Sequence, residues 1–320
     1  MALTNMKVFN AELQTVTIET LAQMVDKFNA ASANAITLTT QGFEGDYRFE
    51  NFFQSLHAAQ RRVDRYATNA TQGATNLAQL QEIGVKVAGG FGPIQWEPGQ
   101  LSWVQMNPAA ALEAISRNLA EAIMRDQLNT AIASATAAIE AQGSAQVNDV
   151  GTGPITYASI NGAHAKFGDS SSLIVADIMD GVTYHSLIGQ NLANAQDLFN
   201  YQGVRVVEVL GKRVVVTDAP ALRETGTGAD YKVLSLVSGG AIVYDGSSLI
   251  TNIETSNGSQ RIVTTMQADY DFGVAVKGFQ WDTTNGGKSP TDADLTTGSN
   301  WDKIATSVKH TAGVLTLANI

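Results

Sequence analysis

The chain has 320 residues, of which 44% are hydrophobic and 16% are charged, a balance typical of folded proteins with enough material for two or three packed units. The net charge is −10, from 20 basic and 30 acidic residues. This argues against a dedicated nucleic-acid binder, because phosphate neutralisation needs clustered lysines and arginines. There is no cysteine, which excludes thiolate catalysis, disulfides and thiolate metal sites.

The four histidines are scattered, and no pair has the three- or four-residue helical spacing of a metal site. We therefore expect neither a metal nor a cofactor. The N-terminus lacks a basic start followed by an apolar core, and the longest apolar runs, such as 173–178, are too short to span a bilayer. The sequence predicts a cytosolic, soluble product without a membrane partner.

The first 67 residues contain segments of different periodicity. Residues 1–16 show no strong period and predict an extended arm, after which Thr17 can cap a helix over 17–28, followed by a strand at 35–40. Apolar residues at three- and four-residue steps predict another helix over 46–67. Four arginines on or near its polar side form either a solvated face or a surface toward another subunit or DNA. They are Arg48, Arg61, Arg62 and Arg65.

Residues 68–106 predict a long two-stranded excursion. Ile83, Val85 and Val87 alternate with polar residues and glycine, and a glycine-rich bend at 89–92 leads to a second strand. A lone hairpin is marginal in water. Its three aromatic residues therefore need cover, either from their own domain or from a partner. They are Phe91, Trp96 and Trp103.

The most prominent predicted element is an uninterrupted helix over 107–142. Asn107 is a suitable N-cap, Pro108 fits the first helical position, and Gly143 supplies a left-handed stop. The interior is rich in alanine, and at 1.5 Å per residue the helix would be about 50 Å long. A helix of this length is more natural as a structural spine than as the wall of an active site.

The second half of the chain predicts an α/β unit and then a long strand. The unit combines a helix capped by Asp180 with a tight turn at Gly211-Lys212 and strands at 173–178, 204–210, 213–217, 231–237 and 241–244. Alternation over 261–281 predicts the cleanest strand, with Gly278 as a β-bulge. A short helix at about 300–306 and a final strand complete the chain.

No group of residues indicates catalysis. There is no Gly-x-Ser-x-Gly elbow, and the run 286–289 lacks the upstream glycine of a Walker loop and is followed by Pro290. Ser159, His164 and Asp169 share a short helix and turn, but such sets arise by chance, and we interpret His164 as a surface or capping residue. We interpret the paired acids at 269 and 271 as a solvated strand face.

The order of these elements is arm, amphipathic helix, two-stranded loop, spine helix, α/β unit and returning strand. It resembles the major capsid protein of tailed bacteriophages, an α+β fold of the Hong-Kong-97 type. The segments 172–179, 184–192 and 210–218 look like the family's peripheral-to-axial region. Residues 269–281, 289–295, Asn300-Trp301 and Lys309 are similar to the C-terminal third of one capsid subfamily. The resemblance covers nearly the whole chain.

The resemblance implies a division of the chain into six segments. These are an N-terminal arm (1–40), the first part of a peripheral domain (41–67), an extended loop that reaches over a neighbouring subunit (68–106), the peripheral domain with the spine helix (107–169), an axial domain (170–255), and the peripheral return strand with the C-terminal segment (256–320).

The implied function is structural, without catalytic residues. Copies would assemble into pentamers and hexamers of an icosahedral phage head, in the host cytoplasm, and enclose double-stranded DNA that slides along an acidic wall without specific binding. A portal and a decoration protein are further implied partners. Because the sequence starts directly with the arm, we expect a separate scaffolding protein or a prior cleavage.

Candidate residues for contacts between subunits are Lys86, Phe91, Trp96, Trp103, Arg61, Arg62 and Arg65. Some family members join an extended-loop lysine to an asparagine of another subunit by an isopeptide bond. Here Lys86 is the only lysine between Lys27 and Lys166, and Asn285 or Asn300 is a conceivable acceptor.

Three alternatives remain open at this point. A bacterial nanocompartment shell of the encapsulin kind shares the fold and would enclose a cargo enzyme. A hydrolase would need an unusual triad, with Ser159 or His164 essential for turnover. A secreted filament or surface-layer protein would need long heptad-bearing terminal helices, which 1–16 and 307–320 do not provide.

Overall fold

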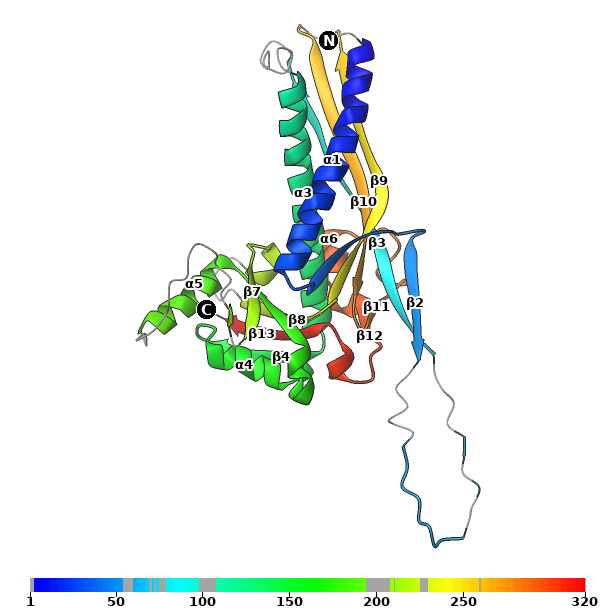
Figure 1. Cartoon of the computed structure of the whole chain (residues 1–320), viewed down its shortest axis with the longest axis vertical. Coiled ribbons are helices and arrows are strands. Elements are labelled where there is room, and N and C mark those ends of the chain that lie inside the picture. Colours follow the sequence, from blue (N-terminus) through cyan, green and yellow to red (C-terminus); the bar gives the residue numbers. More distant parts are fainter. Residues whose placement is uncertain are drawn as a thin grey trace.

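The structure is a computed structural model that describes residues 3–53, 60–68, 71, 73–74, 79–97, 108–193, 208–209, 211–224, 230–258 and 260–319. Two long helices lie along a twisted sheet in the elongated part of the molecule, a second sheet carries shorter helices, and a narrow projection extends away from both (Figure 1). The N-terminus lies at the far end of the elongated part, and the C-terminus lies beside the second sheet.

The first element is helix α1 (Leu3–Ala31), so the predicted extended arm over 1–16 is wrong for the described residues. The buried stripe includes Leu13, Thr17 and Val25, which are four and eight residues apart and so share one face of the helix. Thr17 is not an N-cap, because its hydroxyl donates to the Leu13 carbonyl within the helix (2.7 Å). Because Thr17 is polar, it interrupts the apolar period of this face, and the sequence therefore did not indicate that the helix begins before Thr17.

The spine helix α3 (Pro108–Glu140) confirms the predicted helix. Gly143 has the left-handed φ of +54° that was expected after its end, and the expected cap Asn107 lies outside the described residues. The helix packs beside α1 along the elongated part (Figure 1). Its last turns are buried on several sides, for example at Ile132, Ala135 and Ile139, because they pass between the two sheets.

A five-stranded sheet lies alongside the two long helices. Its order is β1-β9-β10-β3-β2, with β1 parallel to β9 and the other pairs antiparallel. The strands are β1 (Ile36–Gly42), β2 (Tyr47–Phe53), β3 (Gln79–Trp96), β9 (Ala241–Ser256) and β10 (Val263–Val276). The apolar face of β10 packs toward α3, which places the main core between helices and sheet.

The predicted helix over 46–67 is also wrong where the structure describes this range, and 54–59 lie outside the described residues. Residues Tyr47–Phe53 form β2, which pairs antiparallel with the first part of β3, and 60–68 are irregular. Tyr47 pairs with Val85 and Phe49 with Ile83, so the aromatic residues serve a strand period of two. The cross-strand partner decides the conformation here and overrides the helical spacing.

The predicted two-stranded excursion within 82–96 is one continuous strand. The glycines of β3 allow close packing: a Cβ at Gly89 would lie 2.6 Å from the ring of Tyr270, and one at Gly84 would lie 3.0 Å from the Val274 carbonyl oxygen. The glycine-rich segment therefore accommodates side chains and backbone of β10, and it contains a register shift between Phe91 and Ile94, where Gly92 has a φ of +102°, instead of a turn between two strands.

The second sheet has six strands in the order β4-β13-β8-β5-β7-β6. They are β4 (Val147–Thr152), β5 (Ile174–Met179), β6 (Glu208–Val209), β7 (Lys212–Val216), β8 (Asp230–Val237) and β13 (Gly313–Asn319). Helices α4 (Tyr157–Ala165) and α5 (Gly181–Ala193) flank it. Asp180 caps α5 as predicted, since its Oδ1 accepts from the Thr183 N–H (2.9 Å).

Sheet membership differs from the predicted axial segment 170–255. Strand β9 belongs to the five-stranded sheet, although the segment includes it, whereas β4 and β13 lie outside the segment and join the six-stranded sheet. The chain therefore passes from the six-stranded sheet to the five-stranded sheet at about Gly239-Gly240, where Gly239 has a φ of +65°. The names axial and peripheral remain a prediction.

The C-terminal part contains β11 (Phe279–Trp281), α6 (Asp292–Leu295) and β12 (Trp301–Lys303). Gly278 is not a bulge: β10 ends at Val276, and Gly278, with φ +80°, lies in the turn before β11. The predicted helix at about 300–306 is wrong, because 301–303 pair with β11 as a strand. Short 3-10 helices occupy Gly143–Ala145, Gly168–Leu173, Pro220–Leu222, Gly298–Asn300 and Val308–His310.

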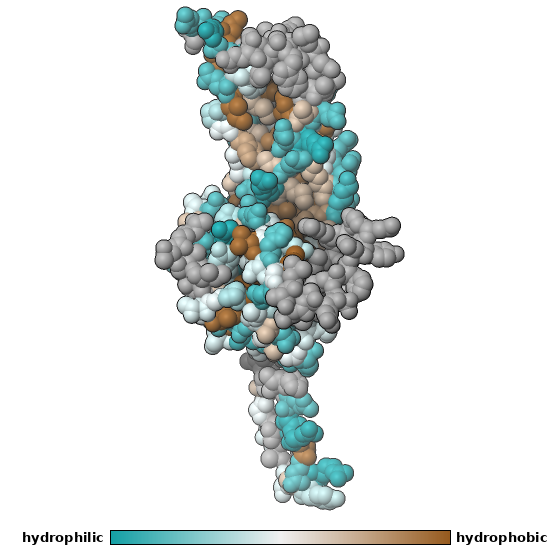
Figure 2. Space-filling view, turned by 90° about the vertical axis from the view of Figure 1, so that its left-hand side faces the viewer, coloured by the Kyte–Doolittle hydropathy of each residue, from teal (hydrophilic) through white to brown (hydrophobic). Residues whose placement is uncertain are grey.

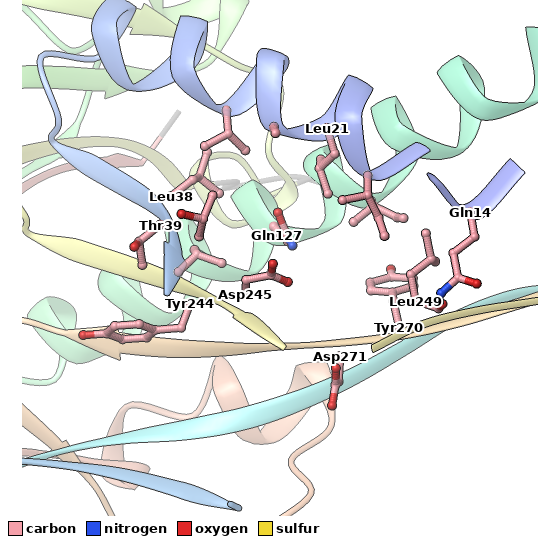
Figure 3. Close-up of a pocket in the computed structure, with 16 residues that line it drawn as sticks. Gln14, Leu21, Leu38, Thr39, Gln127, Tyr244, Asp245, Leu249, Tyr270 and Asp271 are labelled. Carbon is pink, nitrogen blue, oxygen red and sulfur yellow. Dashed lines mark hydrogen bonds between the residues drawn. The ribbon is translucent and has the colours of Figure 1, made fainter. Parts of the chain in front are cut away.

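A cavity of about 190 Å³ lies between α1, α3 and the strands β1, β9 and β10. Gln14 and Leu21 of α1 line one side, and Leu38 and Leu249 line the other (Figure 3). The side chain of Asp271 points to the opposite face of the sheet.

Among the described residues, none of the helices has the length and apolar character needed to cross a membrane.

Candidate assembly interface

The residues with catalytic potential do not form a triad. Ser159 belongs to the capping box of α4, and Asp169 pairs with Lys309. His164 is 5% exposed, which corrects its interpretation as a surface or capping residue. Its Nε2 lies 2.9 Å from Asp177 Oδ1 and 3.1 Å from Ser235 Oγ.

This buried cluster lacks the geometry of a hydrolase. Asp177 and Ser235 face each other on β5 and β8, and the Ser235 hydroxyl donates to Asp177 Oδ1 (2.5 Å). A triad needs the serine and the aspartate on opposite ring nitrogens, whereas both contact Nε2 here. Asp177 and Ser235 are fully buried, so no substrate can reach them in this conformation. The cluster stabilises the packing of α4 on the second sheet.

The other sites that the sequence suggested are structural as well. Gly286 packs on the Trp281 ring, and the Gly287 carbonyl accepts a hydrogen bond from Trp281 Nε1 (2.8 Å). This loop therefore packs around an indole ring and does not form a phosphate-binding loop. Asp269 accepts from Gln267 (3.1 Å). The part of the chain that the structure describes contains no group of three or more histidine or acidic side chains placed to hold a metal.

The feature that stands out is the projection, which we call the tongue and define as residues 47–85. It consists of β2, the paired part of β3 and the segment between them. Residues 60–68 lie far beyond the end of the ladder, away from the rest of the chain, and we call them the tongue tip (Figure 1). In the space-filling view the tongue leaves the body as a narrow extension (Figure 2). Such a projection has little of its own chain to pack against.

The tongue tip is exposed and basic. Arg61, Arg62 and Arg65 with Asp64 give it a net charge of +2. The remaining residues of the chain carry −12, and the two values add to the net charge of −10. Tyr66 is 91% exposed, and the Arg65 guanidinium lies 5.9 Å from its ring centroid. Exposed aromatic residues next to arginines are typical of surfaces that are covered on association. The three predicted arginines are therefore brought together, on an irregular segment instead of a helix.

The base of the tongue is attached to the body through Tyr244 of β9. The Tyr244 hydroxyl donates to Glu50 Oε1 (3.3 Å), and the Arg48 guanidinium lies 4.0 Å from the Tyr244 ring centroid. Arg48 also pairs with Glu50 (3.0 Å). Burial raises the pKa of Tyr244 to about 12, so it keeps the proton that it donates. Strands β9 and β2 are not neighbours in the sheet, and this contact links them across β10 and β3.

Two of the predicted contact residues have partners in their own chain. Lys86 Nζ lies 2.7 Å from Asp271 Oδ2, and both side chains are partly buried. Phe91 is partly buried in the main core and stacks on Tyr270, with ring centroids 5.3 Å apart. Neither residue is presented on the tongue tip.

Of the two remaining predicted contact residues, the tryptophans, the structure describes only one. Trp96 is partly buried at the end of β3, where it pairs with Thr264, and Trp103 lies outside the described residues. Of the conceivable crosslink acceptors, Asn300 is buried and donates to the Asp294 carbonyl (2.9 Å), whereas Asn285 donates to Asp282 (2.5 Å).

Sequence reasoning missed the contribution of Tyr66 and Tyr244. Tyr66 could have been found from its position beside three arginines in a chain that is otherwise acidic. For Tyr244 no such signal exists, because its role depends on which strands meet in the five-stranded sheet.

Comparison with solved structures shows which class of protein has this fold. The capsid asymmetric unit of cyanophage Pam1 matches with 13% identity over 89% of this chain and 88% of that chain, at a TM-score of 0.53. A structure from Mycobacterium phage Cain matches with 10% identity over 88% and 87%, at 0.51. The capsid of Myoviridae phage XM1 matches with 11% identity over 90% of each, at 0.50. The fold is that of phage capsid proteins.

The sequence identifies the family directly. The profile of the Gp13-like family, described as "Major capsid protein 13-like", matches residues 5–315, so the chain belongs to this family of major capsid proteins. A comparison with curated proteins gives no significant match. The protein is therefore a structural component of the virion capsid, which confirms the resemblance seen in the order of the elements and does not favour the nanocompartment alternative.

Proposed function

We propose that copies of this chain assemble into pentamers and hexamers of an icosahedral head that encloses double-stranded DNA. Membership of the major capsid protein family supports this proposal. The net charge of −10 favours a wall along which DNA slides instead of binding. Assembly in the host cytoplasm, and the participation of a scaffolding protein, a portal and a decoration protein, are proposed from the resemblance to phage capsids alone.

The chain is further proposed to transform no substrate, because its Ser-His-Asp cluster is buried and has both partners on one ring nitrogen. The six-segment division is retained with two adjustments. Strand β9 is moved from the axial to the peripheral segment, because it belongs to the five-stranded sheet. The extended loop is proposed to be the tongue, residues 47–85, in place of 68–106. Lys86 and Phe91 then contribute by holding β3 in the body, whereas Arg61, Arg62 and Arg65 contact a neighbouring copy.

The observation that carries the contact proposal is the exposed, basic tongue tip on an otherwise acidic chain. A second copy offers a surface of opposite net charge, and complementary charges favour docking between copies. Trp96 lies at the opposite end of β3 from the tongue and is proposed to gain burial in a contact between copies, because it is only partly covered by its own chain.

The test compares assembly of the native chain with two triple variants at Arg61, Arg62 and Arg65. Electron microscopy and sedimentation should show rings or shells for the native chain and for the change to lysine, which keeps the charge. The change to glutamate should leave small species with an unchanged circular dichroism spectrum. Normal shells from the glutamate variant would exclude the tip contact. A strictly monomeric native chain over a wide concentration range would contradict the assembly proposal itself.

A further inference from the structure

The base of the tongue contains two carboxylates that face each other. Glu50 of β2 pairs directly with Glu82 of β3 in the antiparallel register. Side chains at such positions are about 5 Å apart at Cβ, and like charges directly opposite destabilise the pair of strands. This pair lies where the tongue joins the body, so it acts on the strand contact that holds the tongue in place.

The surroundings of the two carboxylates are different. Glu50 is half exposed and is balanced by Arg48 (3.0 Å) and by the Tyr244 hydroxyl (3.3 Å). Glu82 is partly buried, and its Oε2 accepts from the Gly278 N–H at 3.4 Å, in the turn between β10 and β11. The positive charge of Lys277, in the same turn, also acts on Glu82 from that side. Glu82 thus lies between β2 and the body, with weaker charge compensation than Glu50.

Burial raises the pKa of Glu82 to about 7, and Glu50 acts in the same direction, whereas the Gly278 N–H and Lys277 lower it. A carboxyl group with this pKa changes its protonation state near neutral pH. When it is protonated, the repulsion between Glu82 and Glu50 disappears, and the Glu82 carboxyl group can itself donate a hydrogen bond. When it is ionised, two negative charges lie on adjacent strands.

We propose that the Glu50–Glu82 pair is a proton-dependent switch that controls how firmly β2 is held on β3 at the base of the tongue. With the proton present, the two strands stay paired and the tongue keeps one direction. Loss of the proton weakens the ladder, so the tongue can change its angle to the body while β3 stays anchored on β10. The consequence for contacts between copies rests on the proposed function, but the switch itself is a property of the single chain.

The test measures amide hydrogen exchange in β2 and in 79–85 of the full, unassembled chain between pH 5.5 and 8.5, corrected for intrinsic exchange. For the native chain, protection of these strands should fall about tenfold as the pH rises toward 7 and should level off above it, which corresponds to a difference of about one pKa unit between the paired and the opened state. Protection in β8, which is part of the second sheet, should stay constant. The Glu82→Gln variant should keep high protection at every pH.

Two further variants complete the design. Glu50→Gln removes the opposing charge from the other side and should reduce the pH dependence without abolishing it, because burial of Glu82 remains the larger cause of its raised pKa. This variant keeps the test decisive if Glu82→Gln folds poorly. Glu254→Gln neutralises an exposed glutamate on β9 that pairs with Thr265 and should behave like the native chain. Unchanged pH dependence in both Glu50→Gln and Glu82→Gln would overturn the switch. Shell formation is scored separately by electron microscopy, so failure of the switch leaves the assembly proposal standing.

Discussion

The Tyr270 hydroxyl donates a hydrogen bond to Asp126 Oδ2 over 2.6 Å and so joins strand β10 to the middle of the spine helix α3. Tyr270 also stacks between Phe91 and Phe272, with centroid distances of 5.3 and 6.2 Å. One side chain therefore connects the helix with two strands of the five-stranded sheet.

Replacement of Tyr270 by phenylalanine should lower the free energy of unfolding by about 1–3 kcal/mol, because partly buried Asp126 loses its donor. Chemical denaturation of the unassembled chain measures this. Asp126→Asn is the matched control, and the double variant should cost less than the sum of the two single changes. Strict additivity would mean that the hydrogen bond contributes nothing.

The same pair predicts a pH dependence. Burial raises the pKa of Asp126 above its usual value of 3.8, and the Tyr270 hydrogen bond opposes this shift. A carboxyl group with a raised pKa in the folded state contributes stability that is complete below pH 3.8 and is lost as the pH rises through the folded value. The penalty of Tyr270→Phe should therefore be smaller at pH 4 than at pH 7. An equal penalty at both pH values would contradict this assignment.

His164→Ala should destabilise the second sheet by about 3–5 kcal/mol, because it removes a partner from the fully buried Asp177. His310→Ala is the control: this histidine is exposed, and its replacement should change stability by less than about 0.5 kcal/mol. Urea unfolding curves for the two variants give the comparison. Equal small effects would show that the His164 cluster does not hold α4 on the sheet.

Gly298→Ala tests the fit of the C-terminal segment against the spine helix. A Cβ at this position would lie 2.8 Å from both the Ala137 carbonyl oxygen and the Ala141 Cβ, and we expect a loss of about 1–3 kcal/mol. Ala141→Gly in the same chain should restore part of it. Gly189→Ala, in α5 with free space around it, should instead stabilise by about 0.5–1 kcal/mol. Thermal unfolding distinguishes these outcomes.

Trp281→Phe should lower stability by about 2 kcal/mol, because the Trp281 ring packs edge-on against Trp301 at 4.9 Å and its Nε1 donates to the Gly287 carbonyl. Both rings are at most 2% exposed, so the variant should also lose blue-shifted fluorescence. Trp96→Phe, at a partly exposed position, should mainly lose red-shifted emission. The reverse pattern would contradict the assigned burial.

Local signals in the sequence were sufficient for elements whose caps and periods agree with their final environment. The spine helix has proline at its start and Gly143 beyond its end, and Asp180 caps α5 as the sequence predicts. The buried strand β5 is another such element. For these segments the local preference and the tertiary packing favour the same conformation.

Other elements depended on partners that are distant in sequence. Residues 47–53 have a helix-like spacing of aromatic residues, yet pairing with 79–85 makes them a strand. The hydrogen bond from Tyr244 to Glu50 joins residues 194 positions apart. The exposed arginines of the tongue tip could be selected from composition, but the base of the tongue, with Glu82 and Gly278, could not.

Strand β3 pairs with β2 through 79–85 and with β10 through 85–96, with one register shift between Phe91 and Ile94. A pull on the tongue tip is therefore transmitted lengthwise into the long sheet, where many backbone hydrogen bonds of the β3–β10 ladder resist it together in shear. If the tongue tip contacts a neighbouring copy in a shell filled with DNA, as proposed, this geometry would spread tension from one copy into the sheet of the next instead of concentrating it at a loop.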